Sequence, residues 1–219
     1  MKTIFNSYLF AAALAVVGGG LTLTERPAQA QSTYFTPRAV LAEFFPSSQV
    51  VTYQRFELTA EQRERLTQRL GYAPRKASYT IYIAKTNDQV DGYAVIDEEQ
   101  GQHLPITFAV KLSKTGAVMR QEIMVYRERY GDEVRDPRFR AQFQGKTAND
   151  PLRHGEEVIA VSGATISSRA MALGVRRVLV LVDELILSVK PQPQAKPPIS
   201  QGATGPGSGA VAASTSASG

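Results

Sequence analysis

The chain has 219 residues, of which 43% are hydrophobic and 21% charged, as in an ordinary soluble globular protein. The absence of cysteine excludes disulfides, iron–sulfur clusters, thiol catalysis and haem attached through a C-x-x-C-H motif. Only two histidines are present, at distant positions, which argues against a zinc site, and we expect no metal. The net charge of +5 comes from basic residues interspersed with acidic ones, so we expect no nucleic-acid partner.

The first 30 residues have the pattern of a secretory signal peptide. Lys2 supplies the positive start, residues 8–17 form a short apolar run, and Ala28-Gln29-Ala30 is a small-x-small cleavage site. The alternative is an uncleaved membrane anchor, but the run is shorter than the roughly 20 residues that a spanning helix needs. We therefore predict export to the periplasm.

The last segment, residues 191–219, is rich in Pro, Gly, Ser, Ala and Gln. Such a composition buries too little apolar surface to offset the entropy of ordering the chain, so we predict a disordered tail. Between the two ends, we divide the chain into an N-terminal helical and strand extension, residues 31–77, and a main domain, residues 78–190.

Two helices are predicted in the extension, one on each side of a strand. Thr36 and Pro37 suit the start of a short helix ending near residue 45, and residues 49–58 are rich in the residue types that form strands. Thr59 then begins a capping box with Gln62, which predicts a helix that ends at Gly71.

The main domain begins with strand-like periodicity over residues 79–84, 90–96, 106–112 and 117–126. Their short connections predict an antiparallel sheet. Residues 130–148 are polar and read as loop and short helix, whereas an apolar stripe predicts a long helix over residues 167–189. The fold class is therefore α+β: an antiparallel sheet, flanking helices and a long C-terminal helix.

The segment with the clearest chemical pattern is residues 161–168, Val-Ser-Gly-Ala-Thr-Ile-Ser-Ser, directly before that long helix. A helix N-terminus presents unpaired N–H groups and the positive end of the helix dipole, which together favour an anion such as phosphate. The alternative is that the hydroxyl groups of Ser162, Ser167 and Ser168 only cap the helix.

The string Ser-Gly-Ala-Thr followed by Ile-Ser-Ser resembles the flavinylation motif of the FMN-binding domain family, which includes flavin-carrying subunits of the sodium-pumping NADH:quinone reductase and of the Rnf complex. The resemblance extends over roughly residues 78–187. It implies FMN as cofactor, with its phosphate esterified to Thr165 by a dedicated flavin transferase. One position departs from the family pattern: Ile159 stands where an aspartate, associated with the transferase and its metal, is common.

The same resemblance implies further cofactor-binding residues. Beside Thr165, the phosphate would be lined by main-chain and hydroxyl groups of the motif. Lys146 would offset its charge, although an exposed, solvated lysine is the alternative. Phe143 would stack on the flavin ring, although core packing is the alternative for such an aromatic residue. The candidates that line the phosphate are Ser162, Gly163, Ala164, Ser167 and Ser168.

Two other polar features are interpreted as incidental. The acidic run Asp97-Glu98-Glu99 is typical of a solvated turn, and a lone loop histidine such as His154 is usually without a role. No nucleophile–base arrangement is visible, so we assign no catalytic residue.

The leading hypothesis is an exported flavoprotein that carries electrons between membrane or periplasmic redox proteins. Two alternatives stay open: a non-redox binding or sensing module that has lost flavinylation, and a reductase that uses an exposed FMN to reduce a small molecule.

Overall fold

A computed structural model describes residues 31–188 of the chain. The predicted signal peptide and the predicted disordered tail both lie outside these described residues. In the part that is described, no helix is long and apolar enough to cross a membrane.

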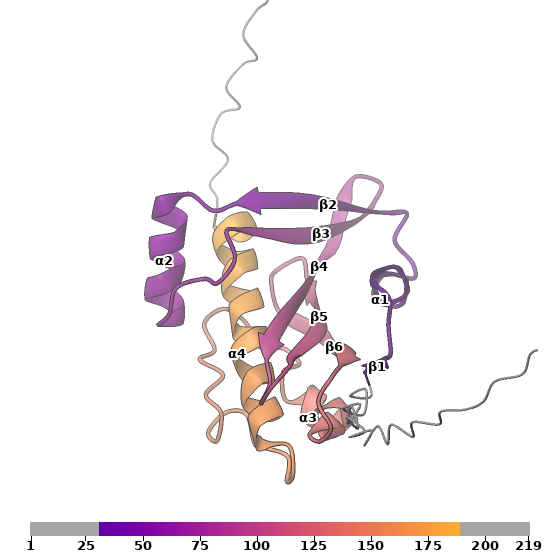
Figure 1. Cartoon of the computed structure of the whole chain (residues 1–219). Helices are drawn as coiled ribbons and strands as arrows, with labels where there is room; N and C mark the ends of the chain where they lie inside the picture. The colour runs from indigo at the N-terminus through magenta and orange to yellow at the C-terminus, as the bar shows by residue number, and fades with distance from the viewer. Residues whose placement is uncertain (1–30, 189–219) are drawn as a thin grey trace, which may run out of the picture.

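The described chain forms one six-stranded antiparallel sheet with helices on both faces (Figure 1). The strand order is β1-β6-β5-β4-β3-β2, and the α+β prediction is confirmed. The elements, in chain order, are β1 (Ser32–Thr33), α1 (Pro37–Phe44), β2 (Val50–Glu57), α2 (Ala60–Leu70), β3 (Ser78–Thr86), β4 (Gln89–Gln100), β5 (Pro105–Ser113), β6 (Val118–Tyr126), η1 (Asp132–Arg135), α3 (Pro137–Ala141), α4 (Thr165–Val182) and the π-helical turn η2 (Asp183–Leu187).

Local sequence signals account for the helix boundaries in the extension. Thr36 accepts a hydrogen bond from the Ala39 N–H at the start of α1. Thr59 and Gln62 form the predicted capping box of α2, and Gly71 ends that helix in the left-handed conformation with φ +82°. Because each of these signals acts within one helical turn, sequence alone was sufficient to locate them.

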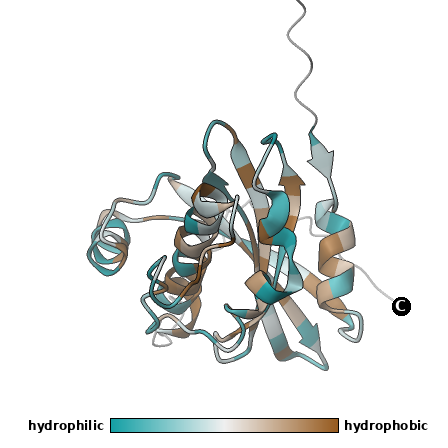
Figure 2. Cartoon of the chain, turned by 90° about the horizontal axis from the view of Figure 1, so that it is seen from below, coloured by the Kyte–Doolittle hydropathy of each residue, from teal (hydrophilic) through white to brown (hydrophobic). Residues whose placement is uncertain are grey.

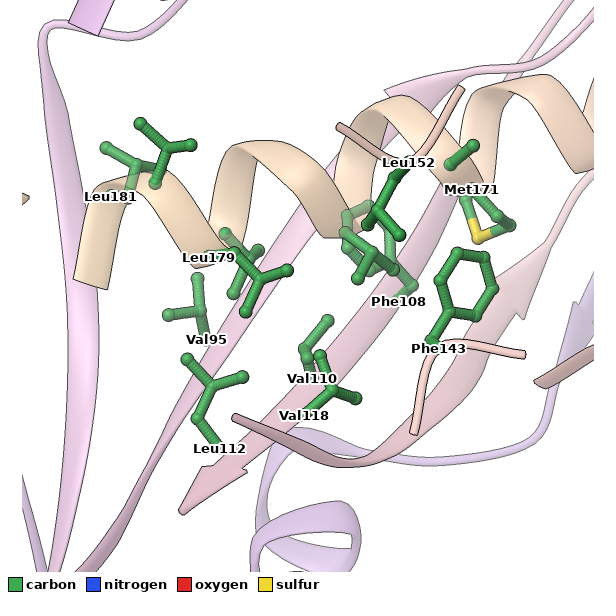
Figure 3. Close-up of a cluster of buried hydrophobic side chains, with 14 of the residues drawn as sticks. Val95, Phe108, Val110, Leu112, Val118, Phe143, Leu152, Met171, Leu179 and Leu181 are labelled. Carbon is green, nitrogen blue, oxygen red and sulfur yellow. The ribbon is translucent and has the colours of Figure 1, made fainter. Parts of the chain in front are cut away.

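The sheet separates a large core from a small one. Helix α4 packs on one face, where alternate residues of β5 contribute Ile106, Phe108, Val110 and Leu112 to the large core (Figure 3). On the other face α1 contributes Val40 and Phe44, which pack against small residues of the strands: Ala84, Ala94 and Ala109. Figure 2 shows the apolar residues concentrated along the central strands and the helices that adjoin them. The two-residue period of a strand thus gives β5 two buried faces.

Helix α4 lies very close to β5 at one point. A Cβ atom placed on Gly174 would lie 2.5 Å from the Phe108 Cζ atom, so only glycine lets the helix approach this far. This contact fixes the height of α4 above the sheet and, with it, the position of the helix N-terminus.

The acidic run on β4 is not a solvated turn, and that interpretation was wrong. Asp97 and Glu99 are 2% and 3% exposed on the face that packs against α4. The Arg177 guanidinium, also buried, donates to the Asp97 carboxylate at 2.8 Å and pairs with Glu99. Lys76 and Arg75 complete the cluster, at 2.6 Å from Asp97 and 2.8 Å from Glu99. Buried carboxylates require such partners because their desolvation is costly.

The start of the long helix also differs from the prediction. We expected the helix to begin at Ser167, but α4 begins at Thr165, so the motif threonine occupies its first turn. The helix then continues into η2, where Asp183 and Glu184 pair with Arg69 and Arg65 of α2. These ion pairs hold the C-terminal end of α4, while its N-terminal end points to the motif loop.

Candidate functional site

The N-terminus of α4 has no side-chain cap. The capping position is occupied by Ala164, and no side chain forms a capping hydrogen bond there. The first-turn N–H groups of a helix have no partner within the helix itself, so this end can receive an anion. The alternative in which the motif hydroxyls only cap the helix does not describe this structure.

The motif loop presents Thr165 to solvent. Gly163 adopts φ +82°, a left-handed conformation that favours glycine, and the Ala164 N–H donates to the Val161 carbonyl at 3.0 Å. This turn leaves Ser162, Gly163 and Thr165 exposed. The Thr165 hydroxyl forms no hydrogen bond with any residue of the described range, so it is available for a bond to another molecule.

A cavity of about 210 Å³ lies beside the motif. One wall is the start of α4, residues 163–167, and the opposite wall comes from the segments that flank the β5–β6 hairpin. Those segments contribute Gln102, Glu128, Tyr130 and Gly131. Tyr130 is 73% exposed at this site. The exposed Thr165 therefore borders a cavity that is open to solvent and has the Tyr130 ring in its wall.

The hairpin is tied to the helix by hydroxyl groups. The Tyr126 hydroxyl donates to the Tyr130 carbonyl at 2.6 Å and lies 2.8 Å from the Ser167 Oγ. Gly131, with φ +97°, lies so close that a Cβ there would be 2.6 Å from both hydroxyl oxygens. Ser167 is therefore bound to Tyr126, and only its main-chain N–H remains for a ligand.

Burial raises the pKa of Tyr126 to about 12, although the hydrogen bond with Ser167 acts in the opposite direction. The folded state thus holds the phenol proton more tightly than the unfolded chain does. This contribution to the free energy of unfolding is fully present below about pH 10 and is lost as the pH rises toward 12.

We expect the free energy of unfolding, measured with urea between about pH 10 and 12, to fall less steeply with pH for Tyr126→Phe than for the wild type. Tyr53→Phe, at a 72% exposed position, is the control and should keep the wild-type slope. Equal slopes for all three proteins would contradict the assignment.

The remaining motif residues differ in whether their N–H and hydroxyl groups are free to bind a phosphate. Ser168 is fully buried, and its hydroxyl accepts from the Val161 N–H at 3.2 Å, so it does not line the cavity. The Ala164 N–H is already bonded within the turn. The groups left for an anion are the N–H groups of Thr165, Ile166 and Ser167 and the hydroxyls of Ser162 and Thr165.

Lys146 and Phe143, the two other residues expected at the cofactor, do not line this cavity. The Lys146 carbonyl accepts from the Val118 N–H at the start of β6, whereas the motif contacts Tyr126 at the end of that strand. Those two strand ends lie about 26 Å apart at the usual rise per residue. Lys146 instead lies 3.5 Å from Asp150. Phe143 is fully buried and packs edge-on against Phe139, with ring centroids 5.5 Å apart, so its faces are unavailable to a flavin ring (Figure 3).

Sequence reasoning missed Gln102, Glu128 and Gly131 of the opposite wall. The Glu128 carboxylate accepts hydrogen bonds from the His103 and Leu104 N–H groups, which holds residues 101–104 beside the motif. The predicted β5–β6 hairpin could have indicated this wall. In an antiparallel pair, the residues just before the first strand lie beside those just after the second strand.

Ile159, the position that departs from the family pattern, is 61% exposed. Its main chain is held at both ends by the Gln142 side-chain amide, which accepts at 2.7 Å and donates at 3.1 Å. The loop geometry is thus supported from α3 without a carboxylate at this position. A different acid lies close to the motif: the Glu133 Oε1 atom would be 3.7 Å from a Cβ placed on Gly163.

Comparison with known proteins supports the resemblance seen in the motif. Residues 101–180 match the sequence model of a family described as FMN-binding domain. This stretch includes β5, β6, both walls of the cavity and most of α4. Over these residues the chain is therefore similar to FMN-binding domains, and this similarity supports FMN as its cofactor.

Among solved structures, a crystal structure of Shewanella oneidensis NqrC is similar to this chain. The two are 16% identical, the match covers 61% of this chain and 79% of that chain, and the TM-score is 0.42. No curated protein matches this sequence.

Proposed function

We propose that this protein is an exported flavoprotein that carries electrons, with FMN bound at the N-terminus of α4 and linked through its phosphate to Thr165. The main support for this proposal is the accessibility of the Thr165 hydroxyl. Its hydroxyl is exposed and free of hydrogen bonds to the described residues, and it lies at an uncapped helix N-terminus inside the matched FMN-binding domain.

The phosphate site is made by the main chain more than by side chains. The N–H groups of the first helical turn have no partner within the helix, and the residues that carry them line the cavity. The helix dipole also favours negative charge at this end. Ser162 adds an exposed hydroxyl that can donate to a phosphate oxygen. These groups hold a phosphate in place without a lysine, which is consistent with the remote position of Lys146.

The cavity favours an electron carrier over an enzyme with a deep substrate site. It is small, about 210 Å³, and the exposed Tyr130 ring offers a flat apolar surface to a flavin. FMN supplies the redox chemistry when it is bound, and the protein holds it and tunes its surroundings. A ring held in so shallow a site keeps an edge accessible to partner proteins. We propose membrane or periplasmic redox proteins as those partners, and a flavin transferase for attachment.

Ile159 stands where an aspartate associated with the flavin transferase is common, so another acidic group would be needed for covalent attachment of FMN. The Glu133 carboxylate lies against Gly163 and supplies an acidic group next to the motif from a different element. We propose that this carboxylate takes the place of the usual aspartate when a transferase engages the motif.

The test is a visible absorption spectrum of the protein exported by a host that contains a flavin transferase. We expect a yellow protein whose colour stays with the pellet after acid precipitation, because a phosphoester survives loss of the fold. A colourless protein would contradict the proposed role as an electron carrier and would favour a non-redox binding or sensing module. A yellow protein that loses its colour to the supernatant would show FMN binding without the ester. Rapid turnover of small acceptors by the yellow protein would favour a reductase instead.

A further inference from the structure

A second cavity, of about 380 Å³, lies along α4 on the side that carries Thr165. Its helical wall includes Arg169, Ala172 and Arg176, which follow Thr165 at helical spacings of four, seven and eleven residues. The end of α2 and residues 151–154 form the other walls. This cavity shares no lining residue with the cavity beside the motif, so it is a separate site.

The charge around this cavity is positive and is not neutralised by the described residues. Arg176 donates to two main-chain carbonyls, those of Pro151 at 2.7 Å and Arg69 at 2.8 Å, and pairs with no described carboxylate. Arg169 is exposed and forms neither a hydrogen bond nor an ion pair with a described residue. A third arginine, Arg153, is already paired with Glu156 at 3.1 Å. The Arg169 guanidinium thus remains for an anion, and Arg176 can offer only the N–H donors that its two main-chain hydrogen bonds do not use.

A buried polar atom without a partner also lies at this cavity. The Nε2 atom of His154, a lining residue, is buried and has no hydrogen-bond partner among the described residues. Buried polar atoms in proteins are nearly always satisfied, so an orphan atom beside a cavity indicates a missing partner. His154 therefore adds a polar group to the wall of this cavity.

The floor of the cavity is apolar and is held in a strained conformation. Leu70, Leu152 and Ala172 supply its apolar surface, and each is less than a tenth exposed. Leu152 has φ +51°, which costs free energy for a residue with a Cβ atom and persists only where the surrounding structure imposes it. An apolar floor with charged groups on one side suits a molecule that has an apolar body and an anionic end.

We propose that this cavity binds a small organic carboxylate with an apolar, ring-sized body, with Arg169 and Arg176 at the carboxylate and His154 in the cavity wall. The volume lies within the range of small-molecule sites. An inorganic anion would leave the apolar floor unused, and a neutral apolar molecule would leave the guanidinium groups unpaired. The occupant would lie about one helical turn from Thr165, next to the proposed flavin phosphate.

The experiment is a calorimetric titration of the purified protein with naphthalene-2-carboxylate. We expect saturable binding at one site and binding about tenfold weaker for Arg169→Gln, because one charge-assisted hydrogen bond is lost. Naphthalene-2-carboxamide, which keeps the ring and lacks the charge, should bind at least about tenfold more weakly to the wild type. Arg138→Gln is the matched control: it removes the same charge from an exposed arginine on α3 and should leave the affinity unchanged.

Three results would overturn the proposal. They are absence of saturable binding by naphthalene-2-carboxylate, equal affinity for wild type and Arg169→Gln, and inorganic phosphate binding as tightly as the aromatic acid. Thermal unfolding of both variants checks that they are folded. The titration needs no flavin, so it can fail or succeed independently of the function proposed above.

Discussion

Thr165→Ala is expected to remove all covalently attached flavin from the protein. The ester needs the Thr165 Oγ1 atom, and alanine has no oxygen at that position. Because the hydroxyl is exposed and unbonded to the described residues, the free energy of unfolding should change by no more than about 0.5 kcal/mol. The measurements are the colour of acid-precipitated protein and its intact mass, which should fall by the mass of one attached FMN.

Two control variants separate attachment from general damage to the loop. Thr165→Ser keeps a hydroxyl at the same helical position and should retain covalent flavin. Ser162→Ala removes the other exposed hydroxyl of the motif and should also retain it, because the main-chain N–H groups still hold the phosphate. Flavin that remains in the acid pellet of Thr165→Ala would place the linkage on a different residue and refute the site.

Arg177→Met is expected to destabilise the protein by about 3–5 kcal/mol, the cost of breaking a buried ion pair by removing one partner. The guanidinium is 3% exposed and contacts both Asp97 and Glu99 across the interface between α4 and the sheet. Without it, the only charged partners of these two buried carboxylates among the described residues are Lys76 and Arg75, whose side chains are 47% and 63% exposed. Urea unfolding at neutral pH is the measurement.

Two comparisons make this result specific to the buried cluster. Arg55→Met breaks an exposed pair with Glu57, in which both side chains are about two-thirds exposed, and should cost less than about 1 kcal/mol. A triple variant, Arg177→Met with Asp97→Leu and Glu99→Leu, should recover part of the lost stability, since no uncompensated charge stays buried. Similar losses for Arg177→Met and Arg55→Met would show that the cluster does not hold α4 to the sheet.

The sequence was sufficient to predict those features that depend on interactions between residues close together in the chain. Thr59, Gln62 and Gly71 mark the ends of α2 because capping and left-handed termination act within a few residues. Alternation of side chains predicted the strands, and the short connections between them predicted an antiparallel sheet. The flavinylation motif was equally readable, because seven consecutive residues form the loop and the first turn that would bind the phosphate.

Other properties depended on contacts between residues far apart in the chain. Asp97 lies in a run of acids that sequence alone assigns to solvent, yet its partner Arg177 is 80 positions away. Lys146 and Phe143 were expected near the cofactor from the sequence, but neither lines the cavity beside Thr165, and Phe143 is buried in the core. Gln102 entered the site only because the hairpin brings its loop to the motif.

The sequence by itself therefore determined the secondary structure and the sheet type, and it is the source of our proposal that a flavin is attached at Thr165. The tertiary structure decided which charges are buried, which side chains surround Thr165, and that a separate cationic cavity lies along the same helix. The reason is physical: backbone propensity and capping are set by near neighbours, whereas burial and charge pairing depend on which distant segments the fold brings into contact.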